Sequence, residues 1–154
     1  ILYRLVGSEM CIRDRFCSSP NTSREGLIDG NIYVHGSVGS NSIQRMRRGI
    51  IVIEKNIGDN CCSNLISGTI IVKGKIGDNF LENSKRGTIF GSDKKVVKGY
   101  RKANDANYNF IPFMGKLLEL IYDRKVLKGS SFLRYQGCLA NSTNLTEIFL
   151  TRKN

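Results

Sequence analysis

The feature that most constrains the fold of this chain is a glycine-marked 19-residue repeat. Four glycines stand one period apart, and each opens a segment of similar pattern: Gly30, Gly49, Gly68 and Gly87. Three complete copies follow one another without an insertion, and a fourth begins. Self-similarity at a fixed period of this size indicates a protein in which each copy is one structural unit stacked on the next.

Apolar residues recur at fixed positions within the copies. Each copy opens with a short run of β-favouring residues, and a strand that short cannot bury an apolar face by itself. Copies stacked about 4.8 Å apart would pair each strand with its equivalent in the next copy. The third position is always isoleucine, and this column should form the centre of the core: Ile32, Ile51, Ile70 and Ile89.

The period also decides between repeat architectures. A left-handed hexapeptide helix needs a period divisible by six, and leucine-rich repeats need a leucine framework that these copies lack. Crossovers between parallel strands are almost always right-handed. The sequence therefore predicts an all-β repeat protein, a right-handed parallel β-helix with 19-residue turns, capped by a C-terminal α-helix and short strands.

A glycine, a serine or aspartate, and an asparagine mark one corner of each copy. Glycine reaches positive φ without a Cβ penalty, the next side chain can bond the backbone of the turn, and stacked asparagines can form amide ladders. The aspartate column also suggests a metal site, but one carboxylate in each turn is more typical of a turn former, and we expect no metal. The structural turn residues are Gly39, Gly58, Gly77, Asp59, Asp78, Asn41, Asn60 and Asn79.

A second apolar column is formed by the fourth position of each copy, directly after the isoleucine. Alternate residues of a strand point to opposite faces, so this column should point outward: Tyr33, Val52, Ile71 and Phe90. A contiguous apolar patch marks an interface, and we expect either a partner subunit or the chain's own tail to cover it. His35, the single histidine, follows this column without an acid–base companion nearby in the sequence, and we interpret it as a surface residue.

The remainder of the chain differs from the repeat. Residues 1–20 do not follow the period, and residues 6–15 resemble translated adapter sequence, so we expect a non-native or disordered leader on a fragment. The β-helix turns should occupy residues 21–91, a polar loop residues 92–109, and a helix with a capping segment residues 110–154. Helical spacing extends from 110 to 128 and places four residues on one apolar face: Phe113, Leu117, Leu120 and Ile121.

Composition limits the partners and the compartment. The formal charge of +11 indicates either a solvated basic surface or attraction of something anionic, such as nucleic acid, an acidic protein or a polyanionic cofactor. Nucleic acid is disfavoured because the aromatic residues occupy the apolar columns instead of alternating with lysines on an open face. No apolar run approaches the roughly 20 residues of a membrane-spanning helix. Five cysteines without a CxxC motif indicate free thiols in a reducing compartment, and we expect the cytoplasm.

The repeat also carries a family resemblance. Residues 30–60 and 68–91 resemble the C subunit of formylmethanofuran dehydrogenase, and most of all the C subunit of the bacterial formyltransferase/hydrolase complex. The C-terminal domain of the large subunit of glutamate synthase has a similar glycine-rich β-helix. Two features favour the formylmethanofuran dehydrogenase family over glutamate synthase. One is the Met-Arg-Arg-Gly segment at 46–49, where one copy leads into the next. The other is the C-terminal tail that follows the repeat, with its segments at 109–113, 132–137 and 147–150. The chain departs from the pattern at Lys55, where other copies have glycine.

This resemblance implies a non-catalytic scaffold subunit in one-carbon metabolism. The complex passes a formyl group from a pterin carrier to a methanofuran-type carrier and hydrolyses it to formate, and archaeal relatives hold molybdenum or tungsten on another subunit. For this chain, the resemblance implies that other subunits are its partners, and that it has no cofactor and no catalytic residue of its own. The alternative is a glutamate synthase-like domain that supports an amidotransferase/oxidoreductase.

The resemblance also gives the basic residues a role. The carrier has an acidic polyglutamate tail, which basic side chains would steer electrostatically. The residues expected to do so are Arg45, Arg47, Arg48, Lys73, Lys75, Lys85 and Arg86.

Overall fold

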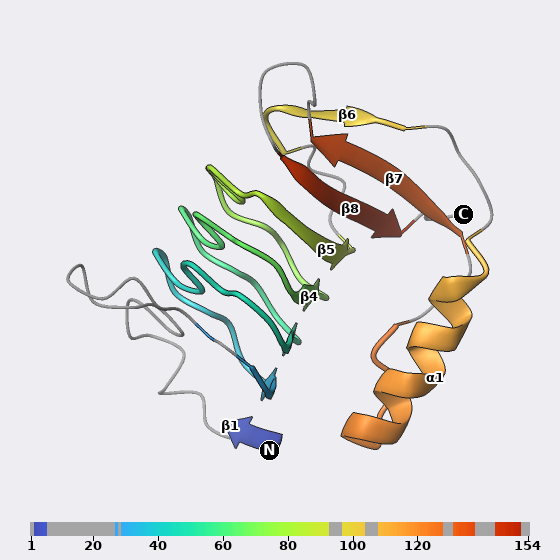
Figure 1. Cartoon of the computed structure of the whole chain (residues 1–154). Helices are drawn as coiled ribbons and strands as arrows, with labels where there is room; N and C mark the ends of the chain where they lie inside the picture. Colours follow the sequence, from blue (N-terminus) through green and yellow to red (C-terminus); the bar gives the residue numbers. More distant parts are fainter. Residues whose placement is uncertain are drawn as a thin grey trace.

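The described part of the chain is one mixed β-sheet with a single α-helix beside it (Figure 1). The computed structural model describes residues 2–5, 27, 29–92, 97–103, 108–127, 131–137 and 144–151. The elements are β1 Leu2–Leu5, β2 Asn31–Val34, β3 Ile50–Ile53, β4 Thr69–Val72, β5 Arg86–Gly91, β6 Tyr100–Lys102, α1 Phe110–Tyr122, β7 Phe132–Gly137 and β8 Leu145–Thr151. The strand order is β1-β2-β3-β4-β5-β8-β7-β6, so the described chain is all-β apart from α1.

The repeat becomes a lateral stack of parallel strands. Strands β2 to β5 pair in register with a shift of one copy, so Ile51 lies between Ile32 and Ile70. A second line of contact runs along the corners, where Ile57 bridges to both Val38 and Ile76. Ile51 is completely buried, as are the equivalent isoleucines of the two following copies. The predicted isoleucine column is therefore the centre of the inner core.

The C-terminal strands close one edge of this stack. β8 pairs with β5 in parallel, placing Ile148 beside Ile89 and Leu150 beside Gly91. β7 pairs with β8, and β6 with β7, in antiparallel fashion, which makes the sheet mixed. Because β8 takes the place that the next copy would have, the apolar columns end under the tail and not in solvent.

Two strands lie where the sequence predicted none. Leu2–Leu5 forms β1 and pairs with β2, but Leu2 faces Asn31, an offset larger than the period of the repeat. This short part of the expected leader therefore continues the sheet, while residues 6–15 lie outside the described residues. Strand β6 falls within the expected polar loop, because its three residues pair with β7, an element distant in sequence.

The corner glycines are required by close approach and not by positive φ. A Cβ on Gly77 would lie 2.5 Å from the carbonyl carbon of Gly58 in the copy below, and neither glycine has a left-handed φ. The expectation of positive φ at these positions is wrong. The asparagines that follow adopt it instead, with φ values of 57°, 54° and 52° at Asn41, Asn60 and Asn79.

The polar corner residues bond from copy to copy. Asp59 Oδ1 accepts a hydrogen bond from the backbone N–H of Asp78 at 2.7 Å, and Asn79 Nδ2 donates to Asn60 Oδ1 at 3.1 Å. The carboxylate of Asp59 thus stabilises the stacking of turns. Among the described residues there is no group of three or more His, Cys, Asp or Glu side chains able to hold a metal ion.

Helix α1 packs on the outer face of the sheet with a side that only partly coincides with the predicted apolar face: Ile121 packs against the outer column, whereas Phe113 and Leu120 do not. Its buried residues are Ile111, Leu118 and Tyr122, whereas Phe113 and Leu120 are 71% and 84% exposed. This helix has two apolar stripes, and periodicity does not say which one meets the sheet. The helix ends at Tyr122, before Lys128, because Asp123 is left-handed with φ of 53°. No helix in the described ranges has the length and apolar character to span a bilayer.

Candidate functional site

The outer apolar column is buried by the chain's own tail. Its members pair side by side along β2 to β5 and are at most 3% exposed: Tyr33, Val52, Ile71 and Phe90. They pack with the buried side of α1 and with β7 and β8, and the Phe90 ring stacks on Phe149 at 5.3 Å between centroids. The column is therefore an internal interface. Of the two predicted coverings, the chain's own tail is the one observed, and a partner subunit on these residues is not.

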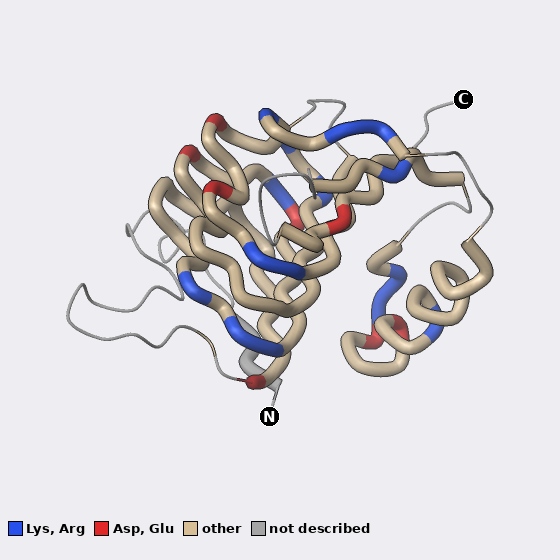
Figure 2. The backbone as a smooth tube through the Cα atoms, turned by 45° about the horizontal axis from the view of Figure 1, so that its top comes forward, with Lys and Arg blue, Asp and Glu red and all other residues tan. Residues whose placement is uncertain are grey.

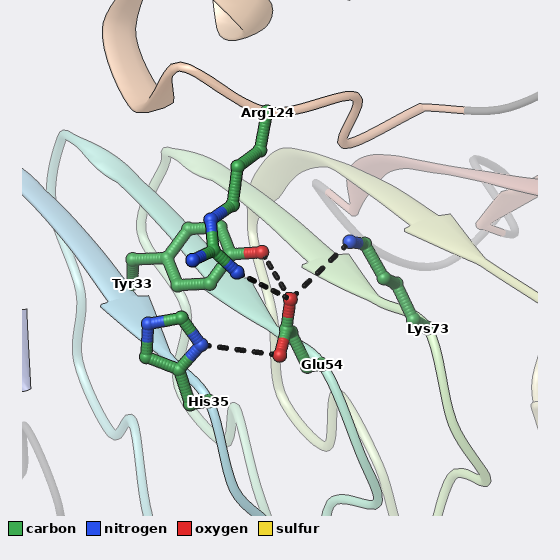
Figure 3. A network of polar contacts seen from close by, with 5 residues as sticks. All are labelled: Tyr33, His35, Glu54, Lys73 and Arg124. Carbon is green, nitrogen blue, oxygen red and sulfur yellow. Dashed lines mark hydrogen bonds and ion pairs between the residues drawn. The ribbon is translucent and has the colours of Figure 1, made fainter. Parts of the chain in front are cut away.

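Polar side chains gather at the carboxyl ends of β2 to β4, beside this column (Figure 3). We call them the polar cluster, which consists of Tyr33, His35, Glu54, Lys73 and Arg124. His35, Glu54 and Lys73 occupy the same position in successive copies, so stacking makes them neighbours. Arg124 comes from the segment that follows α1 and reaches over the sheet to the same carboxylate.

Glu54 is the centre of the polar cluster. Its Oε1 accepts a hydrogen bond from the Tyr33 hydroxyl, and its Oε2 lies 3.2 Å from His35 Nδ1. Lys73 Nζ and Arg124 Nη1 lie 3.8 Å and 3.9 Å from Oε1. The Tyr33 ring also packs against His35, with 4.8 Å between ring centroids.

The environment shifts the pKa values of Glu54 and Tyr33 in opposite directions. Burial alone would raise the pKa of Glu54, but hydrogen bonds from Tyr33 and His35 and the charge of Lys73 hold it below its ordinary value. Burial, together with the hydrogen bond and charge of Glu54, raises the pKa of Tyr33 to about 12. At neutral pH the carboxylate is therefore ionised and the phenol protonated. This arrangement connects the segment after α1 to the sheet.

The period of the repeat relates His35 to Glu54, because the two residues are 19 positions apart. His35 was interpreted as lacking an acid–base companion nearby in the sequence, yet Glu54 lies one copy later and contacts it. In a stacked repeat, a separation of one period means spatial contact. Arg124 has no such signal, because only the packing of the tail brings it to the cluster.

The basic residues proposed for carrier steering do not form one patch. Arg47 and Arg48 are exposed just before β3 begins, and Lys85 and Arg86, two copies later, are exposed at the start of β5, whereas Lys75 is exposed beyond the end of β4. Lys73 belongs to the polar cluster, and Arg45 is half-buried in a left-handed conformation. Figure 2 shows lysine and arginine distributed over several edges of the stack and over the C-terminal part.

Comparisons with known proteins show which fold and which sequence family this chain shares. A solved structure with a similar fold is a chain of the formyltransferase/hydrolase complex from Methylorubrum extorquens in complex with methylofuran, at 24% identity and a TM-score of 0.76. The match covers 91% of this chain and 53% of that one, so this chain spans about half the length of that relative. No curated protein matches the sequence. The family model described as the GXGXG motif matches residues 11–108, more than half of the sequence, and the chain therefore belongs to the GXGXG motif family.

Proposed function

We propose that this chain is the scaffold subunit, equivalent to the C subunit, of a formylmethanofuran dehydrogenase-like formyltransferase/hydrolase complex in the cytoplasm. In this proposal the stacked copies are turns of a right-handed parallel β-helix. The other subunits carry the formyl-transfer and hydrolysis chemistry together with the methanofuran-type carrier, and this chain binds no cofactor of its own. The fold shared with a chain of such a complex supports the proposal.

The observation that carries the proposal is an exposed apolar stripe on α1. Four large side chains repeat along the helix with spacings of three and four residues and are 43%, 71%, 39% and 84% exposed: Phe110, Phe113, Leu117 and Leu120. The buried side of the helix already covers the sheet. Within the described residues Phe113 and Leu120 stay mostly in solvent, whereas the Phe110 ring also contacts Phe149, with 5.6 Å between ring centroids. An apolar stripe at this spacing is the kind of surface that packs against another helix or a groove.

The position of the stripe fits a scaffold. Helix α1 lies beside the stack, away from the corners that join successive copies (Figure 1). A protein bound there would contact the tail without disturbing the pairing of the strands. Exposed apolar patches of this kind mark protein–protein contacts more often than single surface hydrophobics do.

Co-expression with the formyltransferase and hydrolase subunits of the same organism tests the proposal. The wild-type chain should co-elute with them in size-exclusion chromatography, and its combined Phe113→Glu and Leu120→Glu variant should elute alone with an unchanged circular dichroism spectrum. Lys116→Glu is the matched control, since it adds a negative charge to the same helix without removing an apolar side chain, and it should still co-elute. Elution of the wild-type chain as a free monomer would contradict the proposal.

The steering role is a separate part of this proposal. Arg47 and Arg48 are adjacent, exposed and located at one corner of the coil, where they can attract an acidic carrier. In the assembled complex, Arg47→Gln with Arg48→Gln should lower kcat/KM several-fold at low salt and much less at high salt, because screening weakens long-range attraction. An equal loss at both salt concentrations would exclude steering by these residues.

A further inference from the structure

A cavity of about 310 Å³ lies beside the polar cluster, where β4 and β5 end. Its apolar wall comes from both strands, from the residues that follow α1 and from β7: Ile71, Val72, Phe90, Val126, Leu127 and Phe132. Three polar side chains also line it: Lys73, Ser92 and Thr151. The volume falls at the lower end of the range of small-molecule sites, about 300–1,000 Å³.

The two hydroxyl groups of the lining are bonded to backbone. Ser92 Oγ donates to the carbonyl of Lys73, and Thr151 Oγ1 donates to the carbonyl of Gly91 at 3.2 Å. Both side chains therefore hold strand ends together. Among the described residues of the lining, Lys73 is the one with a charged side chain. Its Nζ is turned toward Glu54 of the polar cluster.

The charge around Lys73 favours an anion. Its Nζ is 3.8 Å from Glu54 Oε1, longer than the roughly 2.7–2.9 Å of a charge-assisted hydrogen bond. Glu54 also faces Arg124 at 3.9 Å and accepts the hydrogen bond of Tyr33. Among the described residues, one carboxylate thus faces two full positive charges, and these side chains together carry a surplus of positive charge beside an apolar cavity.

We infer that this cavity binds a small hydrophobic monocarboxylate. The apolar body of the ligand packs against Phe90, Phe132 and Leu127, and its carboxylate pairs with Lys73. An apolar body buries its surface against this apolar wall, whereas a polar body would lose its hydrogen bonds with water. A ligand with a positive head group would be repelled by Lys73 and Arg124. This inference does not depend on the proposed function, because every residue in it belongs to this chain.

Calorimetric titration of the full chain with octanoate, 3-phenylpropanoate and octan-1-ol tests the inference. At least one of the two acids should bind saturably, and the alcohol should bind at least tenfold more weakly than octanoate if octanoate is the ligand. Lys73→Met should weaken binding of the acid about tenfold and leave any binding of the alcohol unchanged. Lys75→Met is the matched control, because Lys75 is exposed, two residues further on and absent from the cavity lining.

A second variant tests the location independently of charge. Leu127→Trp should fill the cavity from its half-buried wall and abolish binding of the acid, while the circular dichroism spectrum stays that of the wild type. Absence of saturable binding of both acids to the wild-type chain would overturn the inference. So would equal affinities of Lys73→Met and Lys75→Met, or unchanged binding by a folded Leu127→Trp variant.

Discussion

Glu54 joins successive copies of the repeat to the tail. Its carboxylate accepts a hydrogen bond from the hydroxyl of Tyr33 in the preceding copy and forms an ion pair with Lys73 in the following copy. Arg124, from the segment after α1, forms a second ion pair with the same carboxylate. These four residues are separated from one another in the sequence by one period or more. The side chain therefore contributes to the order of the stack and to the docking of the tail together.

Replacing Glu54 should reveal this contribution and its pH dependence. Because folding lowers the pKa of Glu54, its stabilisation is present above the ordinary value of 4.5 and is lost as the pH falls through the lower folded value. Glu54→Gln should lower the free energy of unfolding by about 1 kcal/mol at pH near 7 and by much less in strong acid. Denaturant unfolding at both pH values measures this. The same loss at each pH would show that charge is not the cause.

The strands and turns of the stack depend on close approach between backbones. A Cβ at Gly49 would lie 2.3 Å from the carbonyl oxygen of Gly30 in the copy below, and the φ of Gly49 is +99°. Both this close approach and the positive φ exclude a side chain at Gly49. The Gly30 oxygen belongs to the backbone, which cannot move without disturbing the pairing of β2 with β3.

Gly49→Ala should therefore lower the free energy of unfolding by about 2 kcal/mol or more, the scale of one strained residue. Gly115→Ala in α1 is the matched control, because its Cβ would meet nothing closer than the Leu127 Cβ at 3.9 Å. In a helix, alanine is favoured over glycine, so the control should gain about 0.5–1 kcal/mol. Thermal unfolding followed by circular dichroism separates the two variants, and equal midpoints would refute the explanation by close backbone approach.

At the scale of the whole molecule, the tail completes both surfaces of the stack. β8 pairs with the edge of β5, and α1 with β7 and β8 covers the outer column. Removing residues 109–154 should expose this column and an unpaired strand edge together, and such edges promote association between chains. The truncated chain should bind a hydrophobic dye and self-associate in analytical ultracentrifugation, whereas a monomeric truncated chain without dye binding would show that the tail is dispensable.

The repeat could be read from the sequence because each copy buries its apolar residues against its neighbours. The isoleucine column and the outer column follow from a 19-residue period and the alternation of strand side chains. The contact between His35 and Glu54 was also within reach, since one period of separation means adjacency. Local patterns determine these features because the partner of every residue is an equivalent residue.

The tail had to be placed by the tertiary structure. The periodicity of α1 allowed two apolar faces, and only packing against the sheet selected Ile111 and Leu118 over Phe113 and Leu120. The contacts of Arg124 and the lining of the cavity depend in the same way on pairings between segments with no sequence relation. A repeating sequence determines its own stacking, whereas a non-repeating segment finds its place by matching a surface that only the folded stack presents.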